Sequence, residues 1–247
     1  MMGFLISLGE ITDLFLKTCW YIFKRAYHGK NVIYQMMRVG VESIPASVLT
    51  ALSVGMVFAV HVSVEFSRYG AGKVVGGIVG VAVWRELAPL LTGVVVAGRV
   101  GAAIAAEIGT MKVTEQIEAL ETMAVSPISY LVVPRFIALT IMMPILVVFC
   151  DIVGLFGGFL ISVFYANVNP VAFISAAYNI LDARDLWGGL LKALFFGMVI
   201  SLVACYQGLT TTKGAKGVGN STTNSVVISL MTIFIINYFL SLIIFGK

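Results

Sequence analysis

The sequence predicts an all-α polytopic membrane protein, and three observations lead to this fold class. Of the 247 residues, 60% are hydrophobic and 11% are charged, whereas a soluble domain carries roughly 25% charged residues. The mean hydropathy is +1.01. Several apolar stretches also reach the ~20 residues that a helix needs to cross a bilayer. These features are typical of a protein made of several membrane-spanning helices.

The N-terminal region, residues 1–43, is predicted to form an amphipathic helix in the membrane interface. Apolar residues recur there at roughly helical spacing, with basic residues between them: Leu8, Ile11, Phe15 and Ile22, and Lys17, Lys24, Arg25 and Lys30. A first span over residues 4–23 is the alternative, but Glu10, Asp13 and Lys17 would be costly in hydrocarbon. The first positive charge also follows two acids, which is not the order of a secretory signal.

Residues 44–247 are predicted to form one transmembrane domain with about five spans. The spans cover residues 44–66, 87–108, 136–165, 186–209 and 226–245. The stretch from Val74 to Val83 is apolar but too short to cross alone, so we expect a re-entrant or interfacial segment that leads into the second span.

The distribution of Lys and Arg predicts a cytoplasmic N-terminus. With that orientation, ten of the sixteen basic residues lie on the inner side, in agreement with the positive-inside rule. The charged stretch that follows the second span is then cytoplasmic.

That charged stretch is predicted to form a short amphipathic helix over residues 112–125. Its apolar face would hold Val113, Ile117, Leu120 and Ala124, and its other side Glu115, Glu118 and, at the edge, Glu121. The residue before Pro127 avoids the helical region, which ends the helix. Either this is a plain surface helix, or it docks its acidic face on a soluble partner.

A run of small residues lies just before this helix. Gly93, Ala97, Gly101, Ala105 and Gly109 are each four residues apart, a spacing that lets membrane helices approach closely. Packing within the chain and packing across a dimer axis are both compatible with this pattern.

Four ionisable residues in or beside the spans are singled out. Arg85 and Glu86 stand next to an apolar segment, where each charge costs ~2.5–3.5 kcal/mol on insertion scales. They therefore face a cavity or a partner, or form a structural ion pair with each other. Lys192, near the outer end of the fourth span, either snorkels or meets a polar head group. Asp151 is interpreted as a hydrogen-bonding group between helices.

Several functions are excluded by what the sequence lacks. Gly70–Val75 reads GAGKVV, without the Ser or Thr that follows the lysine of a P-loop, so we do not expect this chain to hydrolyse ATP. The three cysteines are far apart and predict no metal site. A net charge of +4 without a basic stripe argues against nucleic acid as a partner.

The region WRELAPLLTGVVVAGRVGAAIAAEIGTMKVTEQIEALETMAVSP closely resembles the signature region of MlaE-type (YrbE) permeases, the membrane subunits of Mce-associated ABC lipid transporters. The matching elements are Arg85–Pro89, Ala97–Gly101, Ala106–Gly109, Thr114–Gln116 and Glu121–Pro127, with Pro134–Arg135 and Gly154–Gly158 further on.

This resemblance implies a homodimer of five-span permeases. The N-terminal segment is not Arg-rich and contains acids, unlike a transit peptide, so we expect a bacterial inner membrane, with a plastid-encoded copy as the alternative. The cytoplasmic coupling helix, with Glu115, Gln116, Glu118 and Glu121, would dock on a separate ABC ATPase that binds ATP and Mg, so no cofactor is expected in this chain. Mce-domain proteins on the outer side would exchange phospholipid with the permease. Arg85, Glu86 and Lys192 fall where polar residues border the lipid pocket of the family.

Two other classes remain as alternatives. An ion channel or ion-coupled secondary transporter would show internal repeats and a midplane cluster of ionisable groups, and the sequence shows neither. A membrane scaffold that transports nothing would leave the ATP turnover of an associated ATPase unaffected by lipid.

Overall fold

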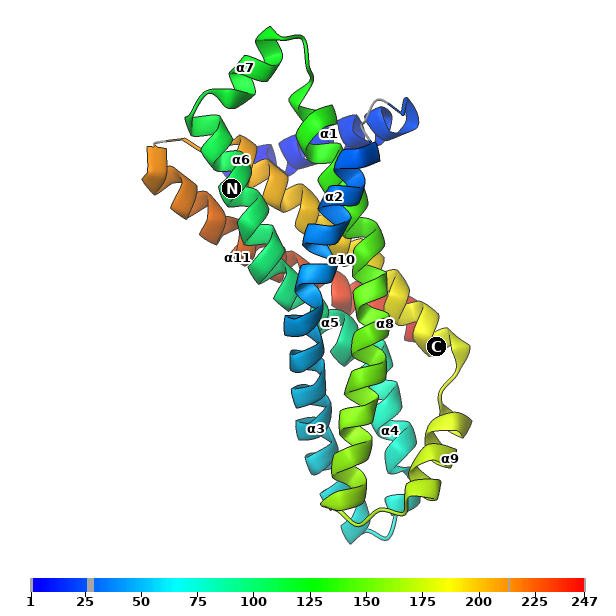
Figure 1. Ribbon diagram of the computed structural model, residues 1–247. Helices are drawn as coiled ribbons and strands as arrows, with labels where there is room; N and C mark the ends of the chain where they lie inside the picture. The colour runs from blue at the N-terminus through cyan, green and yellow to red at the C-terminus, as the bar shows by residue number, and fades with distance from the viewer. Residues whose placement is uncertain (1, 26–28, 213, 247) are drawn as a thin grey trace. The chain divides into compact units, whose positions relative to one another are not determined.

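The computed structural model describes residues 2–25, 29–212 and 214–246, and within them the chain is helical with no strand (Figure 1). Among these residues, five helical stretches are long and apolar enough to cross a membrane, which confirms the predicted all-α polytopic class. They cover Gly29–Arg68, Gly72–Val113, Ile128–Phe164, Ala183–Leu209 and Gly214–Phe245.

The N-terminal region forms two helices, α1 (Met2–Phe23) and α2 (Gly29–Val39). A short 3-10 turn, η1 (Val41–Ser43), joins α2 to the first long span helix, α3 (Ile44–Arg68). The Ser43 hydroxyl donates a 2.6 Å hydrogen bond to the Val39 carbonyl. This bond satisfies a carbonyl at the end of α2, where the helix leaves such groups free.

The second span is a continuous run of helical segments. It contains η2 (Gly72–Val74), α4 (Val75–Ala82), the π-helical turn η3 (Val83–Leu87), α5 (Ala88–Val96), the π-helical turn η4 (Ala97–Gly101) and α6 (Ala102–Val113). The apolar segment that we expected to be re-entrant is α4, and it passes through η3 into α5 without leaving the helical conformation. A π turn takes up an extra residue without a break, and such turns are frequent at functional sites.

The remaining elements follow in order. They are α7 (Gln116–Thr122), the π-helical turn η5 (Ile128–Val132), α8 (Val133–Phe164), α9 (Pro170–Ile180), α10 (Ala183–Leu209) and α11 (Gly214–Phe245). Pro170 occupies the first position of α9, where its missing N–H would be unsatisfied in any residue.

The chain divides into two compact units. Unit 1 contains Met1–Ser43, Val96–Met142 and Phe195–Ile235, and unit 2 contains Ile44–Val95, Met143–Leu194 and Ile236–Lys247. Each unit therefore combines segments that lie far apart in the sequence.

In unit 2, α3 and α8 pack with their backbones close together. A Cβ atom on Gly55 would lie 2.2 Å from the carbonyl oxygen of Gly154, so only glycine fits there. Further along, the hydroxyl groups of Ser63 and Ser162 share a 2.8 Å hydrogen bond. Small residues thus bring these two helices into contact, as is common between membrane helices.

Candidate functional site

The three ionisable residues selected from the sequence as candidates for the lipid pathway come together in unit 2. Arg85 and Glu86 lie on the π-helical turn η3, and Lys192 lies on α10. The Lys192 Nζ atom is 2.7 Å from Glu86 Oε1 and 2.9 Å from the Arg85 carbonyl oxygen. One cluster therefore contains all three residues.

Lys192 is fully buried, with 0% of its side chain exposed. Its ammonium group donates to Glu86, to the Arg85 carbonyl and to the Ser241 hydroxyl, the last at 2.7 Å. An ammonium group has three hydrogens, so every one of them is used. Lys192 consequently holds the cluster together and has no donor left for a ligand.

The Arg85 carbonyl is available to Lys192 because of Pro89. In a regular α-helix this carbonyl would accept the N–H of the residue four positions later, and Pro89 has no N–H. The Lys192 ammonium takes that place. The proline of the signature region thus removes a competing N–H donor from the carbonyl to which the buried lysine donates.

Two residues of α11 complete the hydrogen bonds of the Glu86 carboxylate. Asn237 donates its amide to Oε2 at 2.9 Å, and Ser241 lies 2.8 Å from Oε1. The hydroxyl hydrogen of Ser241 has a second acceptor within reach, the Asn237 carbonyl, at 2.7 Å. Glu86 is therefore oriented by three side chains, although 38% of its own side chain remains exposed.

The Arg85 guanidinium forms an ion pair with Asp185. Its Nε donates to Asp185 Oδ1 at 2.7 Å, and Asp185 is itself buried and accepts the Asp182 N–H through Oδ2. The guanidinium group also lies over the Phe245 ring, 4.6 Å from its centroid. Among the described residues, Nη1 and Nη2 have no hydrogen-bond partner, and 36% of the side chain is exposed. The two Nη atoms form the end of the guanidinium fork, which binds phosphate or carboxylate in a bidentate manner. This end is therefore open to a ligand.

Asp185, Asn237 and Ser241 were not selected from the sequence. Asn237 and Ser241 are four residues apart, so they share one face of α11. Polar residues repeated at this spacing in a span indicate an internal face, and this was the available signal.

The coupling helix predicted over residues 112–125 is shorter in the structure, where α7 covers Gln116–Thr122. Helix α6 ends at Val113, Glu115 adopts a left-handed conformation with φ 58°, and α7 begins at Gln116. Ala124 is also left-handed, so it lies outside the helix. Of the predicted apolar face, only Ile117 is buried, beside a groove of about 750 Å³ between α1 and α7.

The acidic residues of this segment differ in their surroundings. Glu115, Gln116 and Glu121 are exposed, whereas Glu118 forms an ion pair with Lys112. That hydrogen bond holds the pKa of Glu118 below its usual value. Two carboxylates, those of Glu115 and Glu121, therefore have no ion-pair partner among the described residues.

The small-residue run meets helices of its own chain in unit 1. A Cβ atom on Gly101 would lie 3.3 Å from the Ile200 side chain, and one on Gly109 would lie 2.8 Å from Thr211 Oγ1. Ala97 and Ala105 are completely buried. Intrachain packing against Ile200 of α10, and against Thr211 just after it, therefore accounts for the small size of Gly101 and Gly109. Gly93 is buried too, and it belongs to unit 2.

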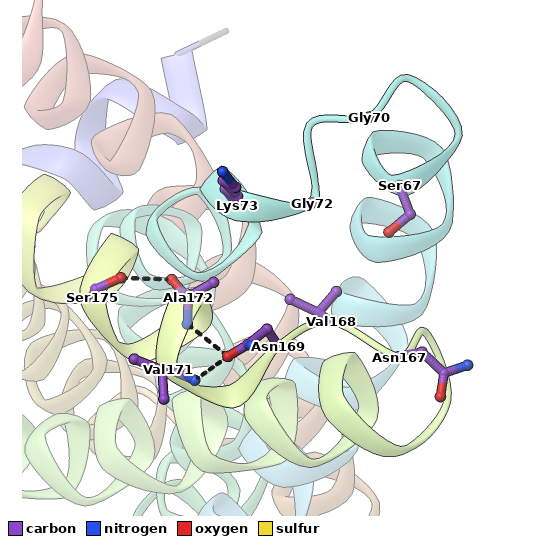
Figure 2. Close-up of a pocket in the computed structure, with 10 residues that line it drawn as sticks. All are labelled: Ser67, Gly70, Gly72, Lys73, Asn167, Val168, Asn169, Val171, Ala172 and Ser175. Atoms are coloured by element: carbon purple, nitrogen blue, oxygen red, sulfur yellow. Dashed lines mark hydrogen bonds between the residues drawn. The ribbon is translucent and has the colours of Figure 1, made fainter.

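A separate cavity of about 560 Å³ lies in unit 2 at the corner between the end of α3 and the start of α9 (Figure 2). Asn169 caps α9 there, with its side-chain oxygen accepting the N–H groups of Val171 and Ala172 at 2.9 and 3.3 Å. Lys73 is the one charged residue among those that line the cavity. This corner contains none of the residues predicted to form a site.

Asp151 differs from the sequence-based interpretation. It is 2% exposed, and neither carboxylate oxygen has a hydrogen-bond partner among the described residues. The prediction that it joins two helices by a hydrogen bond is therefore wrong. An aspartate hydrogen-bonds only where a donor is within reach, and spacing along one helix does not show what the neighbouring helices present.

The fold and the cluster of Arg85, Glu86, Lys192 and Asp185 define a class: a multi-pass α-helical membrane protein with neutralised ion pairs inside its spans. The family model described as Permease MlaE matches residues 32–243. The chain belongs to the MlaE family and is an ABC transporter permease.

Relatives from several sources support this assignment. A probable ABC transporter permease protein of Synechocystis is 48% identical over 225 residues, 91% of this chain and 86% of the relative. One from Rickettsia typhi is 44% identical and covers 91% of this chain and 86% of its own length. The chloroplastic Protein TRIGALACTOSYLDIACYLGLYCEROL 1 of Arabidopsis thaliana is 40% identical over 89% of this chain and 63% of its own length.

Proposed function

We propose that this permease moves phospholipid between a bacterial inner membrane and a Mce-domain lipid carrier on the outer side. A separate ABC ATPase would bind ATP and Mg and supply the energy. The observation that carries the proposal is Arg85, whose guanidinium end is open while its Nε is fixed by Asp185.

The cluster around Arg85 fits a phospholipid head group better than a free ion. Arg85 and Lys192 are balanced by Glu86 and Asp185, so the four side chains carry no net formal charge. Ion-coupled transporters bind their ions through unwound backbone carbonyls and half-helix ends near the midplane, whereas the charged groups of this cluster are paired with each other. A fixed arginine fork in an apolar region instead suits the phosphate of an amphiphile.

The permease assignment implies a partner that hydrolyses ATP, and α7 is the proposed contact. On the proposed orientation, with a cytoplasmic N-terminus, the loop that carries α7 faces the cytoplasm. The exposed carboxylates of Glu115 and Glu121 would meet basic groups of the ATPase, and Gln116 lies between them. Helix α1 exposes Trp20 and Phe23, as a helix that lies in the membrane interface does.

The homodimer and the Mce-domain carrier rest on the family. The lipid substrate has one more support, since the name of the Arabidopsis relative contains that of a glycerolipid. The corner shown in Figure 2 lies at the end of α3 that would face the outer side. It would be the part of unit 2 nearest to an outer-side carrier.

The test is ATP-driven lipid transfer by the complex of permease and ATPase in liposomes, with labelled phospholipid. R85Q removes the open fork, and we expect transfer to fall about tenfold or more, the effect of losing ~1.4 kcal/mol. R184Q is the matched control, because Arg184 lies at the start of α10, next to the Asp185 that binds Arg85, but donates to the Ile244 carbonyl. Equal transfer by both variants, with ATPase binding intact, would show that Arg85 does not contact lipid.

A further inference from the structure

A second charged cluster, in unit 1, joins three helices through one carboxylate. Glu107 of α6 accepts from Arg38 of α2 through Oε2, at 2.8 Å, and from Arg135 of α8 through Oε1, at 3.0 Å. All three residues lie outside the cluster around Arg85. The role of this arrangement is not explained by lipid binding or by the docking surface of α7.

Arg135 is the buried member of the cluster, with 4% of its side chain exposed. Its Nη1 donates to the Leu131 carbonyl, on the π-helical turn η5, at 2.7 Å. Among the described residues its Nε has no partner. A buried guanidinium depends strongly on its carboxylate, so the pair between Glu107 and Arg135 is a fixed link between α6 and the start of α8.

This link lies at the base of the docking helix. Helix α6 leads into α7, and η5 and α8 follow it. Glu107 lies six residues before the end of α6, which is about 9 Å along the helix axis. The Glu107–Arg135 pair therefore joins the segments that enter and leave α7 at a point close to α7.

Arg38 connects Glu107 to α2. It lies in the last turn of α2, which continues through η1 into α3. A second pair attaches the same region: Arg99 donates to Glu42 at 2.9 Å and to the Ser43 hydroxyl at 2.7 Å. The two pairs border one cavity of about 150 Å³. Only the pair made by Arg38 shares its carboxylate with Arg135.

We infer that Glu107 is a positioning residue that transmits displacement of α7 to α2, and through it to the start of α3. This inference rests on the proposed contact between α7 and the ATPase. Arg135 binds Glu107 of α6 and the Leu131 carbonyl of η5, the segments before and after α7. Arg38 links Glu107 to α2. The link between ATP hydrolysis and lipid transfer then depends on Arg38, whereas docking of the ATPase does not.

The first experiment measures lipid transferred per ATP hydrolysed by the complex in liposomes. R38Q removes the ion pair with Glu107 but leaves the buried pair between Glu107 and Arg135 intact. R99Q is the matched control, since the side chains of Arg38 and Arg99 are similarly exposed, at 40% and 38%. We expect R38Q to bind the ATPase normally and to lower the ratio about fivefold or more, the lower end of measured couplings between sites. R99Q should leave the ratio unchanged. An equal effect of both variants, or no effect of R38Q, overturns the inference.

The second experiment follows the motion itself with two spin labels. Cysteines replace Tyr34 on α2 and Met123 beside α7, both exposed, and Cys19 is changed to serine because it is exposed too. With Arg38 present, the distance between the labels should be the same in the nucleotide-free and ATP-bound complex. In R38Q it should change. A change that already occurs with Arg38 present overturns the inference.

The two proposals fail in different ways. If the ATPase still binds after Glu115 and Glu121 are reversed to lysine, the docking surface is wrong, and the inference about Arg38 falls with it. If that reversal releases the ATPase but R38Q transfers lipid at the normal ratio, docking stands and only the transmission through Glu107 is wrong.

Discussion

Lys192 and Glu86, 106 residues apart in the sequence, are joined by a hydrogen bond of 2.7 Å between Nζ and Oε1. This relationship assigns different tasks to residues that look alike in the sequence. Lys192 is buried and uses all its donors, so it fixes the geometry of the cluster. Arg85 keeps the open end of its guanidinium and is the group that can meet a ligand.

K192M should lower the free energy of unfolding by about 3 kcal/mol, the lower end of the effect of breaking a buried pair, because Glu86 is partly exposed. The measurement is thermal or denaturant unfolding of the purified permease in detergent. K17M is the control: Lys17 pairs with Asp13 at the surface, with both side chains more than half exposed, and such pairs contribute about 1 kcal/mol or less. Equal losses in the two variants would contradict a structural role for Lys192.

The docking surface should depend on Glu115 and Glu121 more than on Glu118. E115K/E121K should release the ATPase, because these carboxylates are exposed and have no ion-pair partner in the described chain. E118Q should release less, because Glu118 is already paired with Lys112. Copurification of the ATPase with each variant measures this, and membrane insertion is checked in parallel. A normal complex with E115K/E121K would exclude this docking surface.

The size limit on the small-residue run should be local. G101L forces a side chain against Ile200, which is 3.3 Å from the Cβ position, and overpacking of this kind costs about 1–3 kcal/mol. G98L is the control, since a Cβ on Gly98 meets nothing within 4 Å. The two midpoints of thermal unfolding in detergent are compared. The packing account predicts a lower midpoint for G101L alone.

D151N should leave the permease as stable as before or make it more stable. A buried carboxylate without a partner is costly when charged, and the amide removes that charge at nearly the same size. The same unfolding assay, with D151L as a second variant, tests this. A marked loss of stability in D151N would mean that the carboxylate has a specific partner in the assembled transporter.

Much of the fold follows from local properties of the sequence. The five long helices follow from apolar runs of sufficient length, because a bilayer accepts little other than hydrogen-bonded helices. The division of the expected coupling helix does not. Glu115 in a left-handed conformation separates α6 from α7. A non-glycine residue in that region of φ/ψ space is uncommon, so the apolar periodicity predicted one helix across the position where the structure has two.

The candidate site shows the same limit. Arg85, Glu86 and Lys192 are conspicuous because charged residues in spans are rare. Asp185, Asn237 and Ser241 are ordinary residues until α10 and α11 bring them to Glu86 and Arg85. Glu107 and Arg135 were parts of motifs without a role, and only their 3.0 Å contact indicates one.

The sequence by itself determined that this is a multi-pass helical membrane protein of the MlaE type, because hydrophobicity, charge bias and motif spacing are properties of the chain alone. Only the tertiary structure decided which charges neutralise each other and which remain open. That difference has a physical reason: the cost of a charge in the membrane depends on the donor or acceptor within about 3 Å of it, and those atoms come from helices distant in the sequence.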